Sequence, residues 1–282
     1  MNSNSHFGIR LKKERKRQKM TQQQLAEGIC SQSMLSSIEN ETYIPNVVLF
    51  AQLCARLNLS VERMLLNPYP ILKQQPDFND TIIHLCNLHH YDEMQEYLAK
   101  NEVITQLVTN SDLQTYYYYL GISTYQSQQD WQAAIQQLTL ARTYTSGSSH
   151  TALELLIEAS LAYIKFFHGS NGDARTTFSN CLTLIQNEKV VLPNDNLNSI
   201  YYLYANCLFN NSEFEPGLQV VNQGMTYITA HDSHFMLADL LLLKSAILSQ
   251  LKQPQAAKDS AKKAQTLSEI FQTELFPLPN VH

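Results

Sequence analysis

Amide and phenol side chains recur every four residues in one stretch of this sequence, at Asn198, Tyr202, Asn206 and Asn210. Four residues are close to one turn of an α-helix, so these side chains are expected to share one helix face. An asparagine offers a hydrogen-bond donor and an acceptor together, which matches the backbone amides of an extended peptide. The stretch therefore predicts a peptide site with Asn206 as its main contact. The alternative is a stripe that merely faces water.

Charged side chains interrupt two other apolar stretches that are expected to be helical. Glu154, Glu158 and Lys165 share one helix face, and Lys244 follows a run of leucines. A lysine complements a peptide carboxylate, so Glu158, Lys165 and Lys244 are added to the candidate peptide contacts. For each of them, too, a face exposed to water is the alternative interpretation.

Histidines and cysteines raise the question of a metal site, and they gather in two places. These are His84, Cys86, His89 and His90, and His231 with His234. A closed zinc site needs four ligands at suitable spacing, which these two groups do not supply, so polar turns are the simpler interpretation. The sequence also lacks a phosphate-binding loop and the GxGxxG, GxSxG and HExxH motifs. We expect no metal, no cofactor and no enzymatic activity.

The composition indicates a folded, mainly helical protein. Hydrophobic residues make up 44% of the 282 residues, enough to bury a core, and only 8 glycines and 9 prolines interrupt them. This scarcity favours long helices over many short turns. The five cysteines are scattered, without a CxxC pair, as is typical of a reducing compartment. Because no apolar signal segment or bilayer-length stretch is present, a cytoplasmic protein without a membrane partner is expected.

Charge is distributed unevenly along the chain. Residues 1–66 carry a net charge of +4, from nine basic and five acidic residues, whereas residues 67–282 carry −9, from eleven and twenty. A basic head on an acidic body predicts that only the head approaches a polyanion such as DNA. The basic run over residues 12–17 is also typical of a solvated helix face. Charge alone therefore does not distinguish a DNA-binding surface from a helix face that is exposed to water.

The head is predicted to hold five short helices. They run over residues 7–19, 22–30, 32–39, 47–57 and 61–66. Thr21 with Gln24 forms a capping-box pattern before the second helix, and Ser31 is an N-cap for the third. The second and third helices are thus joined by a tight turn, which is the helix-turn-helix arrangement.

The head resembles the Xre/phage-repressor family over residues 6–66. The matching positions are Arg10 and Arg15, Thr21-Gln22-x-x-Leu25-Ala26, Ser31-Gln32-Ser33, Leu35-Ser36-x-Ile38-Glu39, and Pro45. The resemblance implies that Arg15 and Glu39 form a buried ion pair between the first and third helices. Two positions depart from the family: Cys30 stands where a glycine usually closes the turn, and Glu41 where a glycine usually adopts a left-handed conformation. We expect Asn40 to take over the left-handed position.

The same resemblance assigns DNA contacts. The third helix becomes a recognition helix in the major groove, with base contacts from Gln32, Ser33 and Ser37; for the two serines, exposed positions without a role are the alternative. Gln32 is expected to carry most of the discrimination, because a glutamine pairs bidentately with adenine. Gln22 is expected to bind a phosphate or to support Gln32. The lysines expected at the DNA backbone are Lys12, Lys16 and Lys19.

After a proline-containing linker over residues 67–78, the sequence repeats. A small residue, a bulky one four positions on and a small one three positions further recur about every 40 residues. The copies are Ala134-Leu138-Ala141, Ala174-Phe178-Cys181, Gly217-Val221-Gly224 and Ala257-Ala261-Ala264, with Met94-Leu98-Asn101 as a degenerate first copy. An apolar stretch precedes each copy, over residues 79–89, 112–127, 151–167, 196–210 and 233–250. Five helix pairs over residues 79–282 are therefore predicted.

Paired helices with small residues at their crossing resemble tetratricopeptide repeats. The best match is Tyr117-x-x-Leu120-Gly121 followed by Trp131-x-x-Ala134. The resemblance implies an all-α protein in which a right-handed solenoid presents a concave groove, lined by the first helix of each pair. The tyrosine-rich runs 116–119 and 201–204 are interpreted as core and groove wall rather than as base-stacking platforms, because the array is acidic.

A helix-turn-helix head followed by about five such repeats resembles the PlcR branch of the RRNPP quorum-sensing regulators across nearly the whole chain. The resemblance implies a transcription regulator that binds double-stranded DNA at an inverted-repeat operator as a homodimer. It also implies control by a short signalling peptide in the groove. Two alternatives stay open: a repressor whose repeats bind a protein partner or only dimerise, and an adaptor with a vestigial head.

Overall fold

The structure is a computed structural model that describes residues 7–57, 59, 61, 76–145, 150–169, 174–191 and 194–277. The chain divides into two compact units, Met1–Pro68 and Tyr69–His282, which we name the head unit and the repeat unit. Apart from residue 61, the fifth head helix predicted over 61–66 lies outside the described residues, as does the predicted linker up to residue 75.

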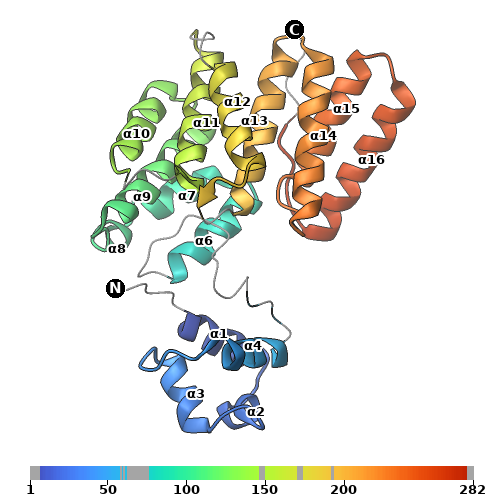
Figure 1. Cartoon of the computed structure of the whole chain (residues 1–282). Helices are drawn as coiled ribbons and strands as arrows, with labels where there is room; N and C mark the ends of the chain where they lie inside the picture. Colours follow the sequence, from blue (N-terminus) through green and yellow to red (C-terminus); the bar gives the residue numbers. More distant parts are fainter. Residues whose placement is uncertain are drawn as a thin grey trace. The chain divides into compact units, whose positions relative to one another are not determined.

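The described part of the head unit consists of the helices α1 to α4, which Figure 1 labels. They are α1 Phe7–Arg17, α2 Gln22–Ala26, α3 Gln32–Glu39 and α4 Val47–Arg56. The predicted N-caps Thr21 and Ser31 are confirmed, since each side chain accepts a backbone N–H from the first turn of its helix, and Asn46 caps α4 in the same way. The helices enclose a small apolar core, whose fully buried members include Leu11, Leu25, Leu35, Ile38 and Leu53.

The turn before the third helix corrects one sequence prediction. Helix α2 ends at Ala26 rather than near Cys30, and the backbone N–H groups of Ile29 and Cys30 both bind the Ala26 carbonyl at 2.9 Å. A chain that folds back this tightly needs a residue with positive φ, and Gly28 supplies it at φ +70°. The glycine of the turn is therefore present, two positions before Cys30.

The turn after the third helix corrects a second prediction. Glu41 adopts the left-handed conformation at φ +58°, whereas Asn40 has φ −96°. The reason lies in the hydrogen bonds at the helix end, where Thr42 N–H binds Ser37 O at 2.9 Å and Glu41 N–H binds Ile38 O at 3.0 Å. This is a Schellman motif, which places its left-handed residue one position after the C-cap.

Five helix pairs form the repeat unit, as the sequence repeat predicts (Figure 1). The pairs are α6 Pro76–Asn87 with α7 Tyr91–Leu98, α9 Asn110–Ser123 with α10 Trp131–Thr143, α11 Ala152–Phe167 with α12 Ala174–Gln186, α13 Asn198–Asn210 with α14 Phe214–Ala230, and α15 Leu237–Gln250 with α16 Pro254–Phe271. The two helices of every pair pack against each other. The all-α fold class is thus confirmed.

Short elements complete the repeat unit. The π-helical turn η1, Thr124–Gln128, continues α9, and the 3-10 turn η2, Asp195–Leu197, precedes α13. A four-residue helix, α8 Asn101–Ile104, follows the first pair. Two strands of two residues each, β1 His150–Thr151 and β2 Val190–Val191, pair in parallel. Among the described residues, these strands and α8 are elements that the sequence analysis did not predict.

Small residues stand where the two helices of a pair cross. A Cβ atom on Gly121 would lie 2.7 Å from Leu138 Cγ, and one on Gly224 would lie 2.7 Å from Tyr201 Cβ. Both distances are shorter than van der Waals contact, so only glycine fits at these crossings. The small residues of the repeat are therefore confirmed as packing positions. Among the described residues, moreover, none of the helices has the length and apolar character needed to span a membrane.

Candidate functional site

The head unit holds a buried ion pair that joins α1 to α3. Arg15 donates to both carboxylate oxygens of Glu39, from Nε to Oε1 at 2.6 Å and from Nη2 to Oε2 at 2.9 Å. Burial alone would raise the pKa of Glu39, but hydrogen bonds from Arg15 and Gln22 hold it below its ordinary value. Glu39 is therefore a carboxylate at neutral pH, and the clamp implied by the family resemblance is confirmed.

Two glutamines extend this pair towards the surface. Gln22 donates from Nε2 to Glu39 Oε2 at 2.9 Å, and Gln32 donates from Nε2 to Gln22 Oε1 at 2.7 Å. Because a carboxylate only accepts hydrogen bonds, Glu39 fixes which way the Gln22 amide points, and Gln22 in turn fixes Gln32. The side chain of Gln32 is exposed, so a buried charge orients an exposed amide at the start of α3.

The other predicted DNA contacts lie on the surface of α1 and α3 and in the turn after α1. Ser33 is exposed, with its hydroxyl 3.0 Å from that of Ser31, and the partly exposed Ser37 donates to the Ser33 carbonyl at 3.1 Å. Both hydroxyls can reorient to meet a ligand, since each is held by a single local hydrogen bond. The three lysines are also accessible: Lys16 and Lys19 are exposed, and Lys12 donates to Asn40 Oδ1 at 3.2 Å.

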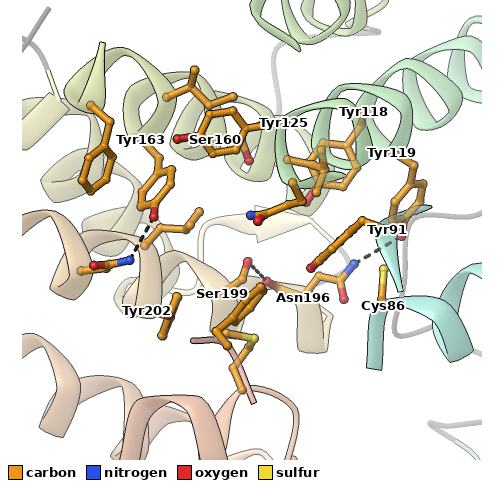
Figure 2. Close-up of a pocket in the computed structure, with 18 of the residues that line it drawn as sticks. Cys86, Tyr91, Tyr118, Tyr119, Tyr125, Ser160, Tyr163, Asn196, Ser199 and Tyr202 are labelled. Carbon is orange, nitrogen blue, oxygen red and sulfur yellow. Dashed lines mark hydrogen bonds between the residues drawn. The ribbon is translucent and has the colours of Figure 1, made fainter. Parts of the chain in front are cut away.

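A cavity of about 790 Å³ opens between the helices of the repeat unit (Figure 2). Its walls come mainly from α9, α11 and α13, with contributions from α6 and α7 and from segments near both ends of the last helix pair. Figure 2 shows that tyrosines from different helices surround it. They are Tyr91, Tyr118, Tyr119, Tyr125, Tyr163 and Tyr202.

Every described side chain in the wall of this cavity is uncharged at neutral pH. The polar groups are phenols, hydroxyls, amides and one thiol. Burial raises the pKa of Tyr118 and Tyr202 above the ordinary value, and it raises the pKa of the Cys86 thiol to about 12. These groups keep their protons and remain hydrogen-bond donors.

Three of the predicted peptide contacts line the cavity, namely Tyr202, Asn206 and Asn210. The Asn206 amide is already engaged, because it donates to the Tyr163 hydroxyl at 2.9 Å and accepts from Asn210 Nδ2 at 2.6 Å. Asn206 therefore links residues of the cavity wall to each other. Its amide has fewer free hydrogen-bonding positions for a ligand than its sequence position suggests.

The cavity also contains a polar residue that sequence reasoning missed. Asn196, in η2, is 5% exposed and donates to the Tyr119 hydroxyl at 3.4 Å. Its Oδ1 atom is buried and has no hydrogen-bond partner among the residues that the structure describes. Asn196 lies before α13 and outside the four-residue spacing, so the periodicity did not reveal it.

Asn198 does not line the cavity, although it belongs to the predicted stripe. It is 1% exposed and donates to Ser233 Oγ at 3.1 Å and to Phe235 O at 3.0 Å. A four-residue step on a helix with about 3.6 residues per turn rotates the side chain by about 40°. Over two such steps, Asn198 turns away from the direction of Asn206 and binds the segment before α15.

The three charged candidates also lie away from the cavity. Glu158 faces Arg142 of α10 at 3.7 Å, Lys165 is exposed on α11, and Lys244 donates to Asn222 Oδ1 of α14 at 2.7 Å. Their side chains lie on faces that meet solvent or the second helices. The described residues hold no group of three or more metal-ligating side chains that could bind a metal ion.

Comparison with known proteins agrees with this description of both units. Residues 11–63 match the helix-turn-helix family, so the head unit is a helix-turn-helix domain, a fold of DNA-binding regulators. No curated protein matches the sequence. Solved structures with a similar fold include PlcR from Bacillus thuringiensis in complex with the peptide PapR7 and DNA, with a TM-score of 0.62 and 23% identity, covering 95% of this chain and 96% of that one.

Two further structures illustrate the range of the similarity. PlcR from Bacillus thuringiensis in its apo form has a TM-score of 0.57 and 21% identity, over 93% of this chain and 94% of that one. ComR from S. thermophilus in complex with DNA and its signalling peptide ComS has a TM-score of 0.46 and 16% identity, over 94% of each chain. At these identities the PlcR structures show that the fold is shared along nearly the whole chain.

Proposed function

We propose that the chain is a DNA-binding transcription regulator controlled by a peptide that binds in the cavity of the repeat unit. The observation that carries the proposal is the buried Asn196 Oδ1 in the wall of that cavity, which no described residue pairs with. Leaving a buried acceptor unpaired costs about 1–3 kcal/mol, so a ligand that supplies an N–H group there binds more tightly. An extended peptide presents such groups along its backbone.

The rest of the wall supports a peptide as the ligand. A volume of about 790 Å³ lies within the range of ligand sites. Tyrosine rings offer apolar surface and a polar tip, which suits a ligand whose backbone is polar and whose side chains are apolar. Tyr202 and Asn210 supply further donors and acceptors along the same wall.

On the DNA side, α3 is the recognition helix. Gln32, held by Gln22, reads a base edge in the major groove together with Ser33 and Ser37. Lys12, Lys16 and Lys19 contact phosphates and add affinity without sequence preference. One recognition helix covers too few base pairs for a specific site, so a homodimer binds an inverted repeat.

The peptide regulates DNA binding by favouring one arrangement of the repeat unit over another, because a ligand shifts an equilibrium only through its differential affinity. The full-length similarity to the PlcR structure, which contains a peptide and DNA, supports the combination of the two ligands. A second candidate function is a repressor whose repeats only dimerise or bind a protein. This candidate is supported by exposed apolar side chains at the end of α16, where a protein partner could bind. They are Ile270 and Phe271, which are 64% and 41% exposed.

Capture of peptides by the purified full chain tests the proposal. An operator is first selected from random duplex DNA, and peptides are then captured from medium conditioned by the source organism and identified by mass spectrometry. The wild-type chain is expected to capture a peptide that changes operator affinity. Asn196→Ala is expected to bind that peptide about tenfold or more weakly. Asn222→Ala, on the exposed face of α14, is the matched control and binds it as the wild type does. A chain that binds its operator but captures no peptide supports the second candidate instead.

A further inference from the structure

The segment that follows α16 returns to the cavity. Helix α16 ends at Phe271, and Gln272 reverses the chain direction in a left-handed conformation at φ +52°. Two hydrogen bonds then hold Thr273 against Ser268, from Thr273 N–H to the Ser268 carbonyl at 3.1 Å and from Ser268 Oγ to the Thr273 carbonyl at 2.5 Å. We name residues 273–277 the return segment. Its last two residues, Phe276 and Pro277, are part of the cavity wall.

The ring of Phe276 lies among aromatic side chains from distant parts of the chain. It stacks on His89 with a centroid distance of 3.8 Å and on Tyr202 with a centroid distance of 5.4 Å. A third ring, that of Tyr91, lies 6.3 Å away and nearly parallel to it. His89 belongs to the first helix pair and Tyr202 to the fourth, so Phe276 fills an aromatic subsite between the two.

A backbone hydrogen bond completes this subsite. Phe276 N–H donates to Asp239 Oδ1 at 2.9 Å, and Asp239 is 6% exposed in α15. An aromatic ring combined with a donated backbone N–H is what any peptide with an aromatic residue presents. The return segment thus occupies the subsite in the way that a bound peptide would occupy it.

Apart from the contacts of Phe276, the interactions that hold the return segment against the repeat unit are weak. Beyond Phe276, the described side chains of the segment make one ion pair, between Glu274 and His90 at 3.2 Å, in which Glu274 is exposed and His90 is partly exposed. Exposed ion pairs contribute little. Phe276 itself is only partly buried, so a competing aromatic residue with its own backbone contacts can displace it.

The uncharged wall restricts which peptides can compete. None of the described side chains that line the cavity carries a charge, and burying a charged group without a partner is costly. A peptide residue with an acidic side chain therefore does not replace Phe276, because the Asp239 carboxylate lies at the same subsite. An aromatic or other apolar residue does.

We propose that Phe276 holds the place of an aromatic side chain of the signalling peptide. The ligand is then a peptide whose central segment is uncharged and carries an aromatic residue, and its binding displaces the return segment. This inference rests on the proposed function, because it concerns the same cavity. It adds the chemical class of the peptide and an internal competitor. With that competitor, the apparent Kd equals the intrinsic Kd divided by the fraction of time the subsite is empty.

The experiment compares the wild-type full chain with Phe276→Ala and with Phe271→Ala. Phe271 is the matched control, since it stacks on His234 at 4.0 Å and does not line the cavity. The probe is a synthetic peptide with the sequence of residues 273–279, acetylated and amidated at its ends. Calorimetry is expected to show that Phe276→Ala binds the probe about tenfold more tightly than the wild type and Phe271→Ala do. Phe276→Tyr keeps the ring and is expected to behave as the wild type does.

Two further peptides test the ligand class. Replacing the phenylalanine of the probe by glutamate is expected to abolish binding to Phe276→Ala, and replacing it by leucine is expected to weaken it. Equal probe affinity for wild type and Phe276→Ala, or no binding of the probe to Phe276→Ala, overturns the inference. Thermal denaturation establishes that each variant is folded.

A pool of random synthetic heptapeptides separates this outcome from a failure of the proposed function. If the wild-type chain retains peptides from the pool while the probe fails on Phe276→Ala, the cavity binds peptides and only the inference is wrong. If neither the pool nor the probe binds any folded variant, both the inference and the proposed function are wrong.

Discussion

Gln32 donates a hydrogen bond from its side-chain amide to Gln22 Oε1 at 2.7 Å, and this bond continues inward through Glu39 to Arg15. The exposed amide is thus oriented before any DNA arrives, which lowers the entropy that binding must remove. We infer that the two glutamines act as one unit, in which Gln22 positions the side chain proposed to read a base.

This relationship predicts non-additive effects of the two glutamines on operator binding. Gln32→Ala is expected to cost about 1–3 kcal/mol of operator affinity and to leave affinity for random DNA nearly unchanged. Gln22→Ala is expected to weaken operator binding less, and to add almost nothing to Gln32→Ala in a double-mutant cycle. The measurement is fluorescence anisotropy with operator and random duplexes. Fully additive effects would show that Gln22 acts independently of Gln32.

Lys16 is expected to contribute affinity without specificity. Its side chain is exposed on α1, where it can neutralise one phosphate. Lys16→Ala should weaken binding to operator and to random DNA by the same factor and lower the slope of log K against log salt by about 1. Titrations at several salt concentrations measure both quantities. Lys262→Ala, on α16 of the repeat unit, serves as the control, and a loss confined to the operator would assign Lys16 a base contact instead.

The ion pair beneath the glutamines predicts how the head unit responds to acid. The pKa of Glu39 lies below its ordinary value of 4.5 in the folded chain, so the charged pair stabilises the head fully above that value. Its contribution is lost as the pH falls through the lower, folded-state pKa. Glu39→Gln is expected to cost about 3–5 kcal/mol at pH 7, since Arg15 stays buried without a charged partner, and to show a flatter pH dependence between pH 5 and 3. Hydrogen exchange of peptides from residues 7–57 measures the stability of the head unit at each pH. An acid profile of Glu39→Gln equal to that of the wild type would argue against a contribution of the ion pair.

Much of the fold follows from local patterns in the sequence. The repeat of small and bulky residues predicts five helix pairs because close helix crossings require small side chains, as Gly121 against Leu138 shows. The Arg15–Glu39 clamp was implied by the family resemblance and is present. The turn residues were harder to predict: Glu41 is left-handed because the hydrogen bonds at the helix end dictate it, and no residue preference marks that position.

The candidate site could be predicted only in part. Residues of α13 were found through their helical spacing, but the spacing could not tell Asn206, which lines the cavity, from Asn198, which binds the segment before α15. The contact between His89 and Phe276 joins residues 187 positions apart. Nothing periodic connects them, since they meet only after five helix pairs have stacked.

Two glycines of α14 offer a matched test of the packing. A Cβ on Gly224 would lie 2.7 Å from Tyr201 Cβ, whereas the nearest atom to a Cβ on Gly217 is Ile247 Cδ1 at 3.4 Å. Gly224→Ala is expected to destabilise the chain by about 1–3 kcal/mol through overpacking. Gly217→Ala is expected to be neutral or to stabilise it by up to about 1 kcal/mol, because alanine favours the helix. Urea denaturation measures both variants, and equal effects would mean that the helix crossing at Gly224 can relax.

The return segment should bind less tightly as the pH rises through the titration of His90. A hydrogen bond that the His90 ring donates to Glu274, together with the charges of Glu93 and Glu274, raises the pKa of His90 above its ordinary value of 6.5. Protonated His90 therefore favours the docked segment. This contribution is fully present below pH 6.5 and is lost as the pH rises through the raised pKa. A competing peptide should consequently bind the wild-type chain more tightly at pH 8 than at pH 6.

The probe for this measurement is the peptide of residues 273–279 with its glutamate replaced by glutamine, so that the probe itself cannot pair with His90. Its affinity for wild type is expected to rise between pH 6 and pH 8, and its affinity for His90→Asn to stay nearly constant, since asparagine does not titrate. His84→Asn removes an exposed histidine of α6 and is expected to keep the wild-type dependence. If His90→Asn retained the full pH dependence, another group would control the docking of the segment. If wild type showed none, the contact between His90 and Glu274 would not contribute to it.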